Sequence, residues 1–140
     1  MNPGASTTAK LALTALGAIH LAVAIWHGQA HTELGVALSP AQNLFVYVVV
    51  VLAPLVAIGL LWTRYTQVGV WLFLIALSGS FLFGVYYHFV FVSPDNIHHL
   101  PPGSEAAHAR FVHSAAILAV VELVSALAAA FVIRAQHRSA

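Results

Sequence analysis

Histidine is the most informative residue type in this chain of 140 residues, where nine histidines equal the total of Asp, Glu, Lys and Arg. Three of them, His20, His27 and His31, are separated by 7 and 4 residues. At about 100° per residue of α-helix, these spacings place all three on one helix face. Two imidazoles at positions i and i+4 can bind one metal ion from a single helical turn. The spacing therefore predicts a metal-ligating face on the first helix.

Further candidate ligands lie where an antiparallel helical bundle would bring them to a similar depth. His88 ends one apolar run and His108 begins another, while Glu33 and Glu105 offer carboxylates at the same level, with Asp95 nearby. Nitrogen and oxygen donors suit Zn, Cu or Fe, and a chain with no cysteine and one methionine lacks the donors of a soft Cu(I) site. The predicted metal ligands are His27, His31, His88 and His108, with Glu33 and Glu105 as lesser candidates.

Haem is an alternative cofactor for the same histidines. Two imidazoles from different helices can ligate one haem iron inside a bundle. The candidate haem ligands are then His20, His88 and His113, with His27 and His108 as further partners. In this alternative the protein is a small b-type cytochrome that holds haem b and exchanges electrons with quinone. The sequence leaves both cofactors open.

A carboxylate near the middle of an apolar run is the second unusual feature. Glu122 interrupts residues 111–133, which contain no other Asp, Glu, Lys or Arg. A charged side chain at the bilayer centre is costly, so such residues pair with other polar groups and often mark functional sites. His20 stands at a similar depth of the first run. We therefore expect His20 and Glu122 to pair, either as a structural contact or as a candidate acid/base pair.

The elements that must position these residues are membrane-spanning helices. The chain is 61% hydrophobic and 6% charged, whereas a soluble domain carries about a quarter charged residues. A spanning helix needs about 20 mostly apolar residues, so the long uncharged runs accommodate four spans. The sequence predicts an all-α, up-down four-helix bundle in a single domain, residues 1–140. The predicted spans lie near 9–30, 41–63, 68–91 and 105–133.

Local motifs support these boundaries. The segment 39–42 reads Ser-Pro-Ala-Gln, which is typical of a capping box with proline at the first helical position. Ser104 follows Pro-Pro-Gly and is expected to cap a helix that begins at Glu105. Pro54 lies inside the second span and is expected to kink it.

The distribution of charge predicts the orientation in the membrane. Basic residues favour the cytoplasmic side. One side of the four-span arrangement carries Lys10, Arg64, Arg134 and Arg138, and the other carries Glu33, Asp95 and Glu105, with Arg110 as the exception. We therefore expect both termini to lie in the cytoplasm. The expected location is the plasma membrane, which in bacteria is the inner membrane. Seven histidines would then crowd toward the periplasmic or extracellular side: His27, His31, His88, His98, His99, His108 and His113.

Several functions are compatible with these features. The favoured function is a membrane metal-binding protein that handles a metal or supports metal-dependent redox or hydrolytic chemistry. The b-type cytochrome and an accessory or assembly subunit of a larger membrane complex are alternatives. An enzyme is less favoured, because short loops leave little room for a substrate domain, and it would depend on a metal or haem. The expected partners are the bilayer and a larger complex or a homo-oligomer, while a net charge of +1 gives no basic surface for nucleic acid.

Overall fold

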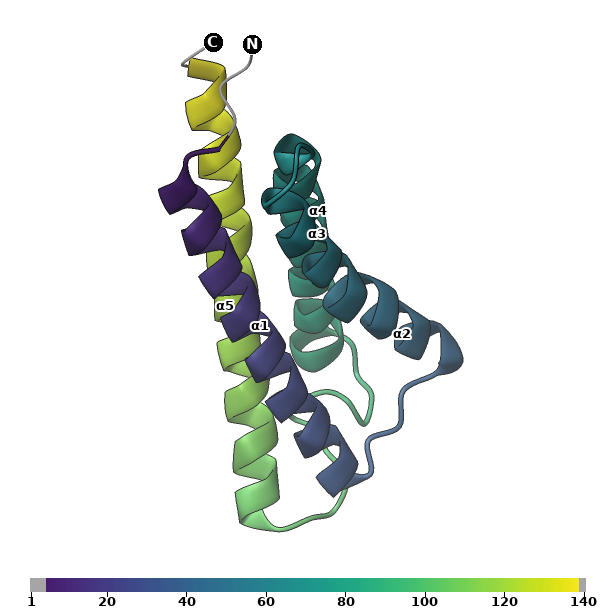
Figure 1. Cartoon of the computed structure of the whole chain (residues 1–140). Helices are drawn as coiled ribbons and strands as arrows, with labels where there is room; N and C mark the ends of the chain where they lie inside the picture. Colours follow the sequence, from purple (N-terminus) through teal and green to yellow (C-terminus); the bar gives the residue numbers. More distant parts are fainter. Residues whose placement is uncertain (1–4, 139–140) are drawn as a thin grey trace.

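The computed structural model describes residues 5–138, which form four long helical segments joined by short loops (Figure 1). The first is α1 and the last is α5, while the two middle segments each contain a stretch of π-helix. The elements are α1 (Thr7–Leu34), α2 (Pro40–Phe45), η1 (Val46–Leu52), α3 (Ala53–Leu61), α4 (Thr66–Val85), η2 (Tyr86–Val90) and α5 (Glu105–Arg138). All four segments are long and apolar enough to cross a membrane. The predicted all-α bundle of four membrane-type helices is confirmed.

Helix caps set the observed boundaries. Ser39 and Gln42 form the predicted capping box, with the Ser39 N–H donating to Gln42 Oε1 at 2.8 Å. Ser104 Oγ accepts the Ala107 N–H at 3.1 Å and so caps α5. α1 continues past residue 30 to Leu34, where Gly35 takes the left-handed conformation (φ 63°) and its N–H bonds to carbonyls of the last turn. Glycine adopts this conformation without steric cost, which fixes where α1 stops.

The second segment departs from regular α-helix just before Pro54. Proline has no N–H to donate to the carbonyl four residues earlier, which here belongs to Val50. The chain runs as a π-helix through Val46–Leu52 and returns to α-helix in α3. Figure 1 shows α2, at the start of this segment, pointing away from α1 and α5. The π-helical stretch η1 therefore lies between α3, which packs in the bundle, and α2, which points away from the preceding helix α1.

Packing places α5 at the centre of the arrangement. α5 lies against α1 on one side and against α4 on the other, and α3 packs on α4. The start of α1, the end of α5 and the α3–α4 loop lie at one end of the bundle (Figure 1). A core that includes Leu13, Leu61 and Phe73 joins the helices toward this end. A second cluster toward the other end contains Ala30, Leu34, Val36, Ala107 and Phe111. This second cluster lies beside the candidate site.

Candidate metal centre

The last two turns of α1 carry two of the candidate ligands. His27 and His31 are one turn apart, and their rings meet edge to face with centroids 4.7 Å apart. The His31 Nδ1 lies 3.4 Å from the carbonyl oxygen of Val36, which the chain reaches directly after the left-handed turn at Gly35. The helix end therefore fixes the orientation of the His31 ring as well as its position.

The third ligand comes from the π-helical end of the third segment. His88 lies in η2, after which the chain leaves the helix and folds back under the imidazole. The Ile97 N–H donates to the His88 carbonyl at 3.0 Å, and the Asn96 side chain donates to the Phe91 carbonyl at 3.1 Å. These bonds hold the loop against the end of the helix and bring Asp95 beside the ring. π-helical turns within α-helices are frequent at functional sites.

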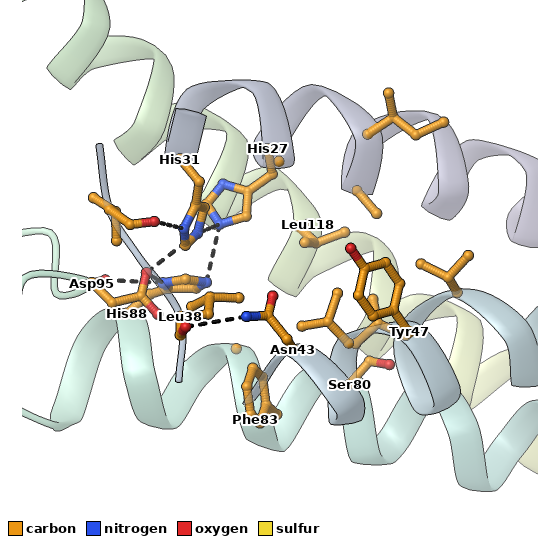
Figure 2. A pocket seen from close by; sticks show the side chains of 18 of the residues that line it. His27, His31, Leu38, Asn43, Tyr47, Ser80, Phe83, His88, Asp95 and Leu118 are labelled. Atoms are coloured by element: carbon orange, nitrogen blue, oxygen red, sulfur yellow. Dashed lines mark hydrogen bonds and ion pairs between the residues drawn. The ribbon is translucent and has the colours of Figure 1, made fainter. Parts of the chain in front are cut away.

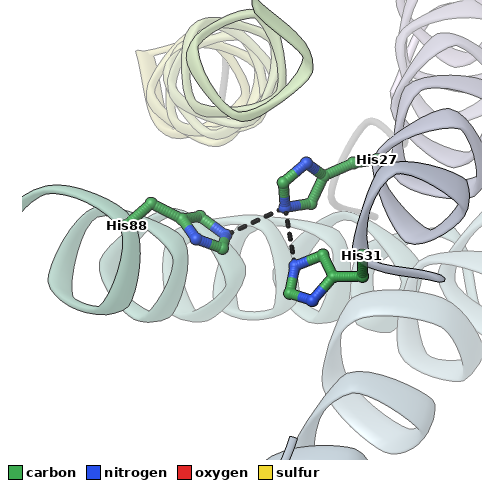
Figure 3. A group of neighbouring side chains, drawn as sticks. All are labelled: His27, His31 and His88. Atoms are coloured by element: carbon green, nitrogen blue, oxygen red, sulfur yellow. Dashed lines mark hydrogen bonds between the residues drawn. The ribbon is translucent and has the colours of Figure 1, made fainter. Parts of the chain in front are cut away.

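The three imidazoles converge on one point (Figure 3). His27 Nε2 lies 3.1 Å from His88 Nε2 and 3.1 Å from His31 Nε2. One nitrogen from each ring falls within 4.8 Å of the others, which is compatible with a single bound metal ion. Two nitrogens bound to one tetrahedral zinc ion at 2.0–2.1 Å would lie about 3.3 Å apart, close to the separations in this cluster. We call His27, His31 and His88 the histidine triad.

The other nitrogen of each ring faces an oxygen acceptor. His88 Nδ1 lies 3.0 Å from the Asp95 carbonyl, and His31 Nδ1 faces the Val36 carbonyl; a carbonyl can only accept. His27 Nδ1 lies 2.9 Å from Ser114 Oγ, whose own hydroxyl donates to the Phe111 carbonyl at 3.1 Å. Each ring therefore donates its Nδ1–H, and in the neutral imidazoles all three Nε2 atoms carry a lone pair. A carbonyl or hydroxyl partner on the distal nitrogen is the usual support of a metal-ligating histidine.

Asp95 adds a carboxylate to this electron-rich cluster. Its Oδ1 lies 3.3 Å from His31 Nε2 and 3.1 Å from His88 Nδ1, and the residue is 4% exposed. Neither carboxylate oxygen has a hydrogen-bond partner within residues 5–138. A buried carboxylate without hydrogen bonds is costly unless a positive charge lies beside it. Asp95 can therefore balance the charge of an ion bound by the three histidines.

Phe111 closes the side of the triad that faces α5. The ring is fully buried, and its centroid lies 4.9 Å from those of His27 and His31 and 5.6 Å from that of His88. Packing against one aromatic ring restricts all three imidazoles. Packed side chains of the protein therefore fix the orientations of the three rings of the triad.

The other predicted ligands lie away from the triad. His108 Nε2 lies 2.8 Å from the Pro101 carbonyl, to which it donates, so this nitrogen is committed to the loop. Glu33 forms an ion pair with Arg110 on the surface, and the Glu105 side chain is exposed at the start of α5. His113 is exposed on the outer face of α5. Of the predicted haem ligands, His88 and its further partner His27 belong to the triad, whereas His20, His108 and His113 do not.

His20 and Glu122, the predicted acid/base pair, lie together deeper in the bundle. His20 Nε2 donates to the Val50 carbonyl at 2.9 Å, the same carbonyl that Pro54 leaves without its α-helical donor. His20 Nδ1 then faces Glu122 Oε1 at 3.6 Å. Glu122 also approaches the triad, because a Cβ placed on Gly84 would lie 3.8 Å from both Glu122 Oε2 and His88 Cδ2. The carboxyl group and the triad therefore flank the same glycine.

A pocket of about 790 Å³ connects these groups (Figure 2). It lies between α1 and the second segment and extends inward to α4 and α5. The triad and Asp95 line one end, Ser80 and Glu122 line its depth, and most other lining side chains are apolar. The histidine triad therefore borders this pocket, as in a metal site that keeps one coordination position free for a ligand.

Sequence reasoning did not identify two supporting residues, Ser114 and Phe111. Both lie on the stripe of α5 that also carries Leu118 and Glu122, with spacings of 3 or 4 residues. A serine between Phe111 and Leu118 on this stripe was the signal available for Ser114. The sequence indicates Asp95 only as a nearby oxygen donor, because its contact with His88 depends on the fold of the loop.

Comparison with protein-family models, curated proteins and solved structures found no match to this chain.

Proposed function

We propose that this chain is an integral membrane metalloprotein that binds one Zn(II), Cu(II) or Fe(II) ion with His27, His31 and His88. The observation that carries the proposal is the convergence of three Nε2 lone pairs whose rings have already donated their Nδ1–H groups. Three acceptors facing one another repel unless a cation lies between them. A single proton on His27 Nε2 would satisfy one contact only, whereas a metal ion accepts all three lone pairs.

The geometry favours a bare ion over haem. Bis-histidine haem requires a planar gap between two imidazoles for the macrocycle. In the triad the ring centroids of His27 and His88 are 4.7 Å apart with edge-to-face rings, and His31 and Phe111 fill the adjacent space. The remaining haem candidates point elsewhere, since His20 bonds to Val50 and His113 is exposed.

The positive-inside rule supports an outward-facing site. The triad lies at the end of the bundle that carries Glu33, Asp95 and Glu105, whereas Lys10 and Arg64 belong to the opposite end. Basic residues favour the cytoplasmic side. We therefore place the metal near the periplasmic or extracellular surface, where the ion can be exchanged or can act as a Lewis acid on a molecule in the pocket.

Elemental analysis of detergent-purified protein tests this function. Wild type dialysed against zinc, copper or iron is expected to retain about one equivalent of a preferred metal, since three imidazoles with supporting hydrogen bonds form a preorganised site. The double variant His27→Ala/His31→Ala is expected to retain less than about a tenth of that amount. The matched control is His98→Ala/His99→Ala, which removes two exposed neighbouring histidines from the loop at the same end.

Circular dichroism and gel filtration verify that each variant keeps its helices and its monodisperse state. Wild type and His27→Ala/His31→Ala with equal, near-zero metal would overturn the proposal. Loss of metal in the His98/His99 control, with the triad intact, would move the site to the loop.

A further inference from the structure

The pocket beside the triad opens sideways, toward the lipid. Ile25 of α1, Tyr47 of η1 and Leu55 of α3 line it and are 66%, 67% and 48% exposed. These side chains lie on membrane-type helices, so their exposed surface faces hydrocarbon rather than water. Figure 1 shows α2 diverging from α1 on this side. A molecule dissolved in the bilayer can therefore enter between α1 and the second segment.

The pocket is elongated. Along the second segment it is lined from Asn43 to Leu55, thirteen residues that rise about 18 Å at helical pitch. A cavity of about 790 Å³ along that length has room for a hydrocarbon chain or a flat ring.

The chemistry of the lining selects an uncharged occupant with an oxygen-containing end. No Lys or Arg lines the pocket within the described part of the chain, and the carboxyl groups of Asp95 and Glu122 do, so the lining side chains disfavour an anionic headgroup. The histidine triad lies at one end of the pocket, where a bound metal ion can take an oxygen atom of the occupant as a ligand.

We propose that this pocket binds an uncharged membrane amphiphile, a hydrocarbon chain that ends in a hydroxyl or carbonyl group. The chain lies between α1 and η1, and the oxygen-bearing end lies at the histidine triad. The position of that end rests on the metal ion proposed above, whereas the position of the chain rests on the pocket alone.

Photolabelling tests the proposal in the full-length protein, zinc-loaded and reconstituted in phosphatidylcholine nanodiscs. The probe is hexadecanol with a diazirine in its chain, and peptide mass spectrometry locates the labelled residues. Labelling is expected within 21–32 of α1 and 46–55 of the second segment, and excess unmodified hexadecanol is expected to compete it away. Removal of zinc by a chelator is expected to raise the half-competing concentration about tenfold, because the oxygen-bearing end loses its contact with the metal.

Two glycines provide a matched blocking variant and control. A Cβ at Gly28, which lines the pocket, has no atom within 4 Å, and neither has a Cβ at Gly59, on the exposed face of α3. Gly28→Leu therefore fills the pocket without a backbone clash and is expected to lower competed labelling about tenfold, while Gly59→Leu leaves it unchanged. Because Gly28 neighbours His27, Ala24→Leu is a second blocking variant, with the exposed Ala22→Leu as its control.

Zinc is measured in every sample, so the two proposals fail separately. In zinc-loaded protein, labelling that is spread over lipid-facing residues and is not competed by hexadecanol would contradict the proposed pocket ligand. The same result would leave the proposed metal site unaffected. Competed labelling in protein that never binds zinc would overturn the metal site and the position of the headgroup, and would keep the chain in the pocket. In a parallel sample treated with a bifunctional cross-linker, links between two copies through α1 and η1 that Gly28→Leu abolishes would overturn the proposal in favour of a protein occupant.

Discussion

His20 Nδ1 and Glu122 Oε1 lie 3.6 Å apart, and both side chains are buried near the midpoints of α1 and α5. Because His20 donates its Nε2–H to the Val50 carbonyl, the neutral imidazole presents a lone pair to the carboxyl group. A single proton must therefore be shared by this pair. In an apolar interior a neutral pair is less costly than an ion pair, so we expect the proton on Glu122.

Glu122→Gln and Glu122→Ala should then behave differently. Glutamine keeps the shape and can donate an N–H to His20 Nδ1, so we expect a change in the free energy of unfolding below about 1 kcal/mol. Alanine leaves a cavity and an unpartnered imidazole, and should cost about 2–4 kcal/mol. Unfolding in mixed micelles measures both, with the exposed Glu105→Ala as control. Equal destabilisation by glutamine and alanine would contradict a protonated Glu122.

Ser114→Ala should weaken metal binding without unfolding the bundle. The substitution removes the acceptor of the His27 Nδ1–H, which fixes both the tautomer and the ring orientation. Loss of such a supporting partner lowers metal affinity by about 10- to 100-fold. Ser125→Ala is the matched control, since Ser125 is equally buried on α5 and its Oγ has no partner among residues 5–138. Competition with a chromogenic chelator gives the affinities, and identical values for both variants would contradict this role of Ser114.

Asp95→Asn should also weaken the site, although for an electrostatic reason. The carboxylate lies within 3.3 Å of nitrogens of His31 and His88, and asparagine keeps its size while removing the charge. We expect at least a tenfold loss of zinc affinity, about 1.4 kcal/mol. Glu105→Gln removes an exposed carboxylate from the same end and should leave the affinity unchanged. The reverse result, an effect only at Glu105, would favour a ligand set on the surface of α5.

Gly69→Ala should destabilise the bundle, whereas Gly59→Ala should not. A Cβ at Gly69 would lie 2.9 Å from the Ala57 carbonyl oxygen and 2.9 Å from the Leu61 nitrogen, both backbone atoms of α3. Backbone cannot yield cheaply, so the expected cost is about 1–3 kcal/mol. Gly59 has open space at the same position, and alanine there should stabilise by about 0.5–1 kcal/mol through its better helix propensity. Thermal unfolding of both variants measures the difference, and equal shifts would mean that α3 and α4 do not pack closely at Gly69.

The sequence alone determined the four membrane-type helices and the first pair of triad residues. Long uncharged apolar runs permit only helices in a bilayer, and the structure confirms four of them. His27 and His31 had to share a face, because the periodicity of one helix is fixed by its backbone. The placement of Glu122 and His20 at matching depths followed from the same count of residues per turn.

Tertiary structure decided which further groups join that pair. His88 and Ser114 are 61 and 87 positions from His27, and no local rule fixes how separate helices rotate against each other. Packing of α5 between α1 and α4 turns Ser114 and Phe111 inward, while the same loop that brings Asp95 to His88 engages His108 through Pro101. Helical periodicity specifies the face of a side chain, and only the contacts between helices and loops specify what that face meets.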